Sequence, residues 1–327
     1  MNGKSSKPPG GVGALASARP SPVGAVPRSA LAPQPGVTPR PSVVRPPAPS
    51  VATPDREFAF SNADFERVRA LIYKHAGISL SPIKQDMVYS RLARRLRARG
   101  DKTFAEYLDR AEREPAEWET FVNSLTTNLT SFFREAHHFE ILAERLKKHA
   151  GRNPVRIWCS AASTGEEPYS LAITACEAFN SMTPPVEIVA TDIDTNVLTT
   201  ARGGVYGMDR VERLSRERMQ RFFLKGTGSQ AGFARVRPEL QRLIEFKRIN
   251  LLDRSWALQG PFDIMFCRNV MIYFDKPTQY DILKRFVPLL KPDGLLFAGH
   301  SESFLHAADI FRSLGRTVYE RTDARER

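Results

Sequence analysis

Apolar residues recur at intervals of three and four positions between residues 58 and 152, a spacing typical of amphipathic helices. Ser61 begins the first helix as a cap, and Gly77 ends it. The pair Ser81-Pro82 opens a second helix, which Gly100 ends. The same spacing predicts three more helices, over residues 103–113, 115–125 and 137–149. This segment is therefore predicted to be helical throughout.

From residue 155 onward, short apolar runs alternate with helical patterns. Strands are predicted over residues 155–159, 186–192, 244–250, 262–267 and 294–299, with a final edge strand over 317–321. Between them, helices are predicted from 166, over 196–202 and over 278–290. This alternation indicates a doubly wound, Rossmann-like α/β sheet. Glycines break the rhythm between about 203 and 240, where we expect an insert with a small antiparallel sheet.

Pattern and composition together divide the chain into three parts. Residues 1–56 are dense in proline, glycine, alanine and serine and contain no aromatic residue, so we expect a disordered tail. Residues 57–135 are expected to form an all-helical domain with its linker. Residues 136–327 are expected to form the α/β domain that carries the insert.

Composition excludes several classes of protein. Of the 327 residues, 42% are hydrophobic, which is enough for a packed core. No apolar run approaches the ~18 residues of a membrane span, and the N-terminus lacks the apolar segment of a secretory signal. The three cysteines have no metal-ligand spacing and fit free thiols in a reducing compartment. We therefore expect a cytoplasmic protein that is not inserted in a membrane.

The net charge of +12 is concentrated in two places. Residues 1–56 hold seven Lys or Arg and one acid, and five arginines fall within residues 91–99. A charged helical face is usually only solvated, but arginine also suits bidentate recognition of carboxylates and phosphates. Acidic protein helices and nucleic acid both remain compatible partners for this face. The arginines that we assign to it are Arg91, Arg94, Arg95 and Arg97.

A predicted strand, a loop of small residues and a helix start follow one another at residues 155–168. This order is the nucleotide cradle of doubly wound sheets. The loop lacks the phosphate-loop pattern and its lysine, and Glu166 and Glu167 stand where a phosphate would bind. An acidic cradle suits a cationic, amino-bearing nucleotide such as S-adenosylmethionine.

Several polar residues have both a structural and a cofactor-binding interpretation. Asp192 ends a strand 27 positions after Gly165, where an acid can bind ribose hydroxyls, although it could instead cap the next helix, as could Asp194. Glu166 could be a plain helix-start charge or could face the cationic end of the cofactor. One helix would not place Asn128, Thr130 and Arg134 on the same face, so they could line a cleft together only from a connector between helices. Equally, Asn128 or Thr130 could cap the next helix while Arg134 is a solvated charge. The histidines lack the partners of a metal site or a catalytic triad.

Four motifs together resemble one family. NLTSFFREAHHF at 128–139, SAASTGEEPYS at 160–170, FCRNVMIYFD at 266–275 and GHSES at 299–303 occur in this order. They resemble the CheR-type chemotaxis receptor methyltransferases, which are protein-glutamate O-methyltransferases. The resemblance covers about the last five-sixths of the chain.

The resemblance implies an enzyme that uses S-adenosylmethionine and no metal, and releases S-adenosylhomocysteine. It implies methylation of glutamates on the cytoplasmic helices of chemoreceptors, by a monomer. It assigns catalytic positions to Arg134 and Tyr273 and favours Glu166 over Glu167. The implied cofactor-binding residues are Asn128, Thr130, Arg134, Glu166, Asp192, Asn250, Leu251, Arg268 and Asn269.

Two further expectations concern partners. The glycine-containing insert resembles that of family members that tether to a receptor's C-terminal peptide. The rival interpretation is a nucleic-acid methyltransferase or an RNA-binding protein, which the basic charge favours. Amino-methylating enzymes of that class carry [DNS]-P-P-[YF] after the fourth strand, where this chain reads Arg268-Asn269-Val270-Met271. We therefore expect chemoreceptors, and no nucleic acid, as partners.

Overall fold

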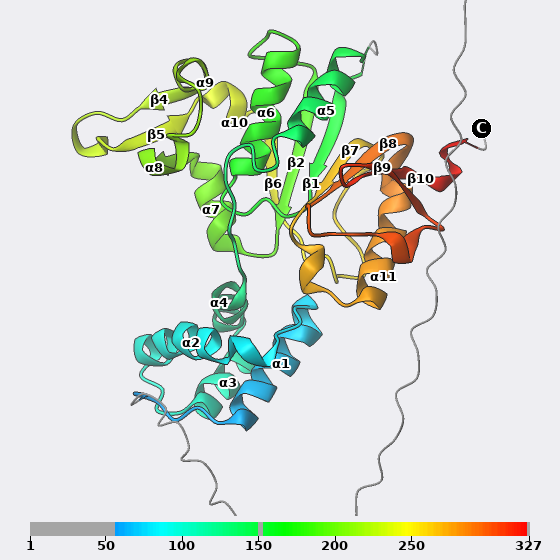
Figure 1. Cartoon of the computed structure of the whole chain (residues 1–327). Coiled ribbons are helices and arrows are strands. Elements are labelled where there is room, and N and C mark those ends of the chain that lie inside the picture. The colour runs from blue at the N-terminus through cyan, green and yellow to red at the C-terminus, as the bar shows by residue number, and fades with distance from the viewer. Residues whose placement is uncertain (1–55, 150–152, 326–327) are drawn as a thin grey trace, which may run out of the picture. The chain divides into compact units, whose positions relative to one another are not determined.

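The computed structural model describes residues 56–149 and 153–325 (Figure 1). The predicted tail, residues 1–56, lies outside the described residues apart from Arg56. Contacts place residues 53–327 in one compact unit, and the domain boundary after residue 135 stays a prediction. The helices before the first strand are α1 (Asn62–Ala76), α2 (Gln85–Arg99), α3 (Phe104–Arg113), α4 (Pro115–Leu125) and α5 (His137–Lys147).

Local signals explain where α1 begins and ends. The Ser61 hydroxyl accepts a hydrogen bond from the Asp64 amide at 3.1 Å, and the Asp64 carboxylate accepts one from the Ser61 amide at 2.9 Å. This reciprocal capping satisfies amides at the helix start. Gly77 ends the helix in the left-handed region (φ 66°), and a Cβ there would lie 2.9 Å from the Phe274 ring. Glycine is therefore required by both backbone conformation and close packing.

The main sheet is doubly wound, as predicted. Strand order is β6-β2-β1-β7-β8-β10-β9, with β6, β2, β1, β7 and β8 parallel and β10 antiparallel to both neighbours. Strand order reverses direction at β1, so the ends of β1 and β7 flank the switch point where ligands bind in such sheets. The strands are β1 (Val155–Cys159), β2 (Val186–Asp192), β6 (Ile244–Arg248), β7 (Phe262–Cys267), β8 (Leu290–Ala298), β9 (Phe311–Gly315) and β10 (Val318–Arg321).

The last strand is not at the sheet edge, which corrects the sequence prediction. β10 lies between β8 and β9, and β9, which was not predicted, forms the edge. The two strands are joined through Arg316 and Thr317, whose φ angles are 53° and 56°. Two positive φ angles are typical of a tight hairpin turn, which usually carries Asn-Gly. The Arg-Thr pair gives no such signal in the sequence.

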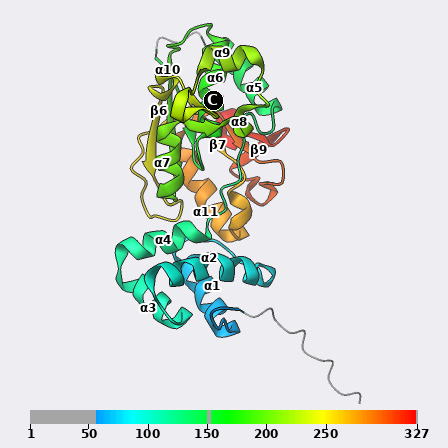
Figure 2. The same cartoon turned by 90° about the vertical axis from the view of Figure 1, so that its left-hand side faces the viewer.

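Helices cover both faces of the sheet (Figures 1 and 2). On one face α5, α6 (Glu166–Ala178) and α7 (Thr195–Gly203) share a core with Ile157 of β1. On the other face α11 (Lys276–Phe286) shares a core with the next residue, Trp158. Successive strand side chains point to opposite faces, so β1 contributes to both cores.

The predicted insert is present, and its small sheet has the order β3-β5-β4 with antiparallel pairing (Figure 1). Tyr206 of this insert donates its hydroxyl proton to the Thr164 carbonyl at 2.7 Å. The insert is thus hydrogen-bonded to the small-residue loop after β1. Its elements are β3 (Val205–Gly207), α8 (Met208–Val211), α9 (Arg216–Phe222), β4 (Phe223–Lys225), β5 (Phe233–Val236) and α10 (Pro238–Gln241). No helix of the described residues is long and apolar enough to cross a bilayer.

Candidate active site

A pocket lies at the switch point of the sheet. Residues that follow β1, β2, β6 and β7 line it, together with the connector between α4 and α5 and the segment between α1 and α2. One set of lining residues is apolar and includes Ile78, Leu80, Ile249 and Phe274. Another set is polar or charged. The predicted site residues that line the pocket are Asn128, Thr130, Arg134, Asp192, Asn250, Leu251, Arg268, Asn269 and Tyr273.

Asp192 is a buried carboxylate in the pocket wall. Its Oδ2 accepts a hydrogen bond from the Ser163 amide at 2.8 Å, and its Oδ1 accepts one from the Asp194 amide at 3.0 Å. Burial raises the pKa of Asp192 to about 6, against the lowering effect of these backbone donors. The helix that follows is capped by Asp194, whose Oδ1 accepts from the Asn196 amide at 2.9 Å. Asp192 is therefore available to the pocket.

The two glutamates at the start of α6 point to different partners. Glu166 is fully buried, pairs with Arg210 of the insert and accepts a hydrogen bond from the Thr164 hydroxyl at 2.6 Å. It is not among the residues that line the pocket, whereas Glu167 is. The geometry thus favours Glu167 over Glu166 for cofactor contact. Ser163 and Lys84 are lining residues to which the sequence interpretation gave no individual role, and it named Glu167 only as part of the acidic cradle.

A buried ionic network forms the wall beside Glu167. The Arg268 side chain is 0% exposed, and its Nη1 donates to Glu167 Oε2 at 2.6 Å. Its Nη2 lies 3.2 Å from Glu135 Oε2 and donates to the Arg134 carbonyl at 2.5 Å. Burial would raise the pKa of Glu135, but Arg268 and His300 outweigh it and bring that pKa to about 2. Glu167 therefore presents a carboxylate to the pocket, which the cations Lys84, Arg134 and Arg268 also line.

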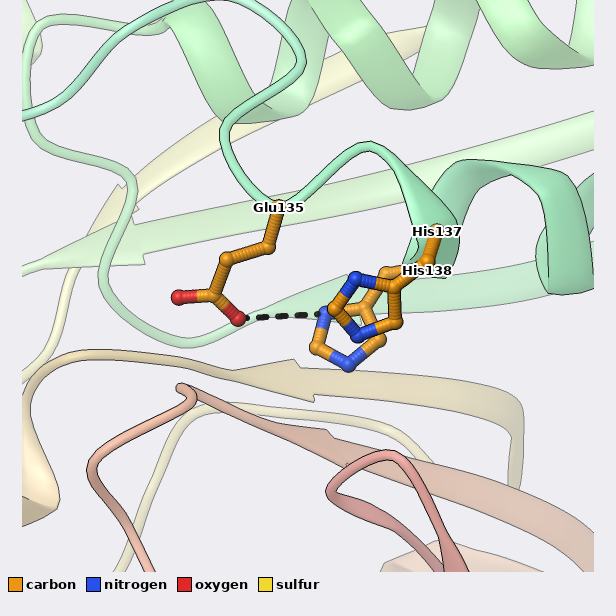
Figure 3. Close-up of side chains that lie close together, drawn as sticks. All are labelled: Glu135, His137 and His138. Atoms are coloured by element: carbon orange, nitrogen blue, oxygen red, sulfur yellow. Dashed lines mark ion pairs between the residues drawn. The ribbon is translucent and has the colours of Figure 1, made fainter.

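Glu135, His137 and His138 lie close enough to share a metal ion, with ligand atoms within 4.8 Å of one another (Figure 3). His138 Nδ1 is 3.6 Å from Glu135 Oε2, and its Nε2 is 2.9 Å from the Arg316 carbonyl. Burial lowers the pKa of His138 to about 4, so its imidazole is neutral at pH 7. The same Glu135 oxygen faces the Arg268 guanidinium, whose positive charge would repel a cation. We therefore assign no metal to this cluster.

Asn250, Arg134 and Tyr273 are held in the wall by specific contacts. The Asn250 amide donates to the His75 carbonyl at 2.6 Å, and its oxygen accepts from the Leu252 amide at 3.0 Å. Arg134 donates to the Leu129 carbonyl at 2.9 Å. The Tyr273 carbonyl accepts from the Ser79 amide at 3.0 Å. These contacts connect the wall to the helical segment and the connector.

The four arginines of α2 differ in what they contact, and none lines the pocket. Arg91 donates to the Thr126 carbonyl at 2.6 Å, and Arg95 pairs with the buried Glu117 at 2.9 Å. Arg97 is exposed and pairs with the exposed Glu57. Arg94 is exposed, and its side chain makes no hydrogen bond or ion pair within the described residues. Arg94 and Arg97 are therefore the arginines of this face that a partner can reach.

Known proteins match this chain over most of its length. Residues 63–126 match the family model described as CheR methyltransferase, all-alpha domain, and residues 128–320 match the one described as CheR methyltransferase, SAM binding domain. Chemotaxis protein methyltransferase 2 of Pseudomonas aeruginosa is 55% identical over 272 residues, covering 83% of this chain and 97% of that protein. The chemotaxis protein methyltransferases of Salmonella typhimurium and Escherichia coli are 54% and 51% identical. Their matches cover 81% and 80% of this chain, and 92% and 91% of those proteins.

Proposed function

The chain belongs to the CheR methyltransferase family, and we propose from this premise that it converts glutamate side chains on the cytoplasmic helices of chemoreceptors into 5-O-methyl esters. It is an S-adenosylmethionine-dependent methyltransferase of chemotaxis. The observation that carries the proposal is the pocket at the switch point, lined by the carboxylates of Asp192 and Glu167. We place the activity in the cytoplasm and in a monomer.

The residues of the pocket fit this cofactor. Among the described residues, the Asp192 carboxylate accepts hydrogen bonds from backbone amides alone, which leaves lone pairs for ribose hydroxyls. Apolar residues such as Ile249 and Leu251 offer a surface for the adenine ring, and the Glu167 carboxylate offers a counter-charge to the positive methionine end. When bound, S-adenosylmethionine supplies an electrophilic methyl group.

The protein's own residues have mainly to position the reactants. A glutamate carboxylate is ionised at pH 7, so the substrate needs no general base. It must instead present one oxygen in line with the methyl carbon, and rotation of the carboxylate opposes this. Arg134 and Tyr273 line the pocket, and a hydrogen bond from either to the second oxygen would hold the carboxylate in orientation.

Transfer of a labelled methyl group tests the proposal. Membranes that contain chemoreceptors should acquire tritium from S-adenosyl-[methyl-³H]methionine in the presence of the protein, and mild alkali should release it as methanol. Release in alkali identifies a carboxyl ester, because N-methyl groups are stable to it. Failure to label the receptors, or label that resists alkali, would contradict glutamate methylation.

We expect Tyr273→Phe to lower kcat about tenfold or more while the affinity for cofactor stays within a few-fold of wild type. The substitution removes one hydroxyl and keeps the ring in the wall, so it removes an orienting contact with little loss of binding. Stopped-time methylation assays would give kcat, and calorimetry with S-adenosylhomocysteine would give the affinity. Full kcat in the variant would leave Tyr273 as pocket wall alone.

We expect reversal of charge at Arg94 and Arg97, each to Glu, to raise the apparent KM for receptor without changing cofactor affinity. Exposed arginines attract acidic receptor helices through a screened Coulomb interaction, so the effect should shrink at high salt. Arg95→Glu is the matched control, because Arg95 pairs with the buried Glu117 and should mainly reduce stability. Unchanged receptor kinetics in the Arg94/Arg97 variant would indicate a solvated face.

We propose that the insert tethers the receptor's C-terminal peptide. Leu224 of β4 and Phe233 of β5 are 41% and 45% exposed, and the exposed Arg235 of β5 pairs in register with Leu224. Exposed apolar side chains beside an arginine suit an aromatic, acidic peptide, which could also pair with a strand edge. Such a peptide should bind in a calorimetric titration, more weakly to Leu224→Asp. No binding at millimolar concentration would exclude tethering.

A further inference from the structure

Glu302, in the Gly299-His300-Ser301-Glu302-Ser303 motif after β8, is a buried carboxylate without a cationic partner. It is 5% exposed, and no Lys, Arg or His of the described residues forms an ion pair with it. A carboxylate buried without such a partner is costly unless several hydrogen bonds stabilise it. The contacts of Glu302 must therefore account for how its buried carboxylate is stabilised.

Backbone amides of two separate turns converge on this carboxylate. Oε2 accepts from the Gly299 amide at 2.5 Å and from the Asn269 amide at 2.9 Å, and Oε1 accepts from the Ile272 amide at 3.3 Å. Burial raises the pKa of Glu302, while these amides favour its ionised form. Glu302 thus connects the end of β8 with the turn that follows β7.

That turn carries pocket residues in a constrained conformation. Asn269 and Tyr273 line the pocket, and Asn269 has a φ of 59°, which is uncommon for a residue with a side chain. A Cβ at position 299 would come within 2.3 Å of the side-chain amide nitrogen of Asn269, so glycine is needed there. Such a backbone conformation persists only where surrounding contacts fix it.

We propose that Glu302 is a positioning residue for methyl transfer: its carboxylate fixes the Asn269–Tyr273 turn and thereby sets the Tyr273 hydroxyl and the Asn269 side chain in the pocket. Glu302 is not among the lining residues, so it acts through the turn and touches neither substrate nor cofactor. The inference rests on the proposed function, because it assigns a role within that reaction.

Only an ionised carboxylate matches the contacts that Glu302 makes. It accepts hydrogen bonds at both oxygens, whereas an amide of the same shape presents one acceptor and one donor. In Glu302→Gln the amide NH₂ would face either the Ile272 amide or the pair from Gly299 and Asn269. Glu302→Gln therefore loses the hydrogen bonds at one of the two oxygens, with almost no change in side-chain volume.

The test compares methyl transfer to receptor membranes by wild type and by Glu302→Gln. We expect kcat to fall about tenfold to a hundredfold, with a smaller change in S-adenosylhomocysteine affinity, because small misplacements of reacting groups have large effects on rate. Ile272→Pro removes the hydrogen bond from the Ile272 amide to Glu302 Oε1 and should also lower kcat.

A double-mutant cycle separates positioning from general stability. If Glu302 acts through Tyr273, the tenfold effect of Tyr273→Phe should shrink to less than about threefold in the Glu302→Gln background. Asp101→Asn is the matched control, since Asp101 is also 5% exposed and pairs with Arg110 away from the pocket. It should leave kcat unchanged even where it lowers the melting temperature.

The outcomes distinguish this inference from the proposed function. If wild type transfers no methyl group, the proposed function fails. If wild type is active and either folded variant, Glu302→Gln or Ile272→Pro, keeps wild-type kcat, the positioning role is overturned. Fully multiplicative effects of Glu302→Gln and Tyr273→Phe would overturn it as well.

Discussion

Asp192→Asn should weaken the binding of S-adenosylhomocysteine about a hundredfold or more. A carboxylate that accepts two ribose hydrogen bonds contributes about 1.5–3 kcal/mol for each of them, and 2.7 kcal/mol corresponds to a hundredfold in affinity. The asparagine keeps the shape of the buried side chain but loses the charge and one acceptor. Calorimetric titration at pH 7.5 would measure the change. An affinity within threefold of wild type would show that Asp192 does not hold the ribose.

The pH dependence of the same titration gives a second, independent readout. Burial raises the pKa of Asp192 to about 6, and ribose hydroxyls bind its ionised form. Wild-type affinity should therefore be constant above about pH 7 and fall as pH drops through 6. Asp192→Asn should show no such fall. Asp101→Asn removes a buried carboxylate that does not line the pocket, so this variant should retain both the affinity and the pH dependence of wild type.

Arg268→Met should lower the free energy of unfolding by about 3–5 kcal/mol at pH 7.5, the cost of leaving a buried ion-pair partner uncompensated. The guanidinium is fully buried, and its removal leaves Glu167 and Glu135 without their shared cation. Denaturation by urea, followed by fluorescence, would measure the loss. Arg145→Met is the control, because Arg145 pairs with the exposed Asp293 and should contribute less than about 1 kcal/mol.

The loss should depend on pH in a direction set by Glu135. In wild type its pKa is lowered to about 2, so the stabilisation is complete above the ordinary value of 4.5 and is lost as pH falls from 4.5 towards 2. Without Arg268, the lowering effect of its guanidinium on the Glu135 pKa is lost, while burial still raises that pKa and His300 still lowers it. Glu135 of the variant should then take up its proton at a higher pH than Glu135 of wild type, so the difference in unfolding free energy should narrow as pH falls. A difference that is small or independent of pH would contradict the network.

Element boundaries were predicted best where the signal is local. The bounds of α4, β1, β2 and β7 agree with those predicted from the sequence. The capping box at Ser61 and the left-handed Gly77 and Gly100 act within four residues of the ends that they define. β9 was missed because its hairpin turn uses Arg316 and Thr317, whose positive φ angles are imposed by strand pairing.

The choice between neighbouring acids needed the tertiary structure. Glu166 and Glu167 are adjacent in a helix, so their side chains point about 100° apart. Which of them reaches the pocket depends on how α6 is rotated against the sheet. Glu166 pairs instead with Arg210 of the insert. The same holds for Asp192 and Asp194. Asp194 caps the next helix and Asp192 lines the pocket, and which residue takes which role depends on where the strand ends.

By itself, the sequence determined most of the order of helices and strands outside the insert, the doubly wound class of the sheet, and a set of polar positions at strand ends. Periodicity, caps and strand ends are encoded within a few residues. The tertiary structure decided which of those side chains share a wall. Arg268 meets Glu135 and Glu167 across separations of 133 and 101 positions, and Glu302 reaches the Asn269 amide across 33. Such contacts leave no periodic trace in the chain, since they depend on packing that brings remote turns together.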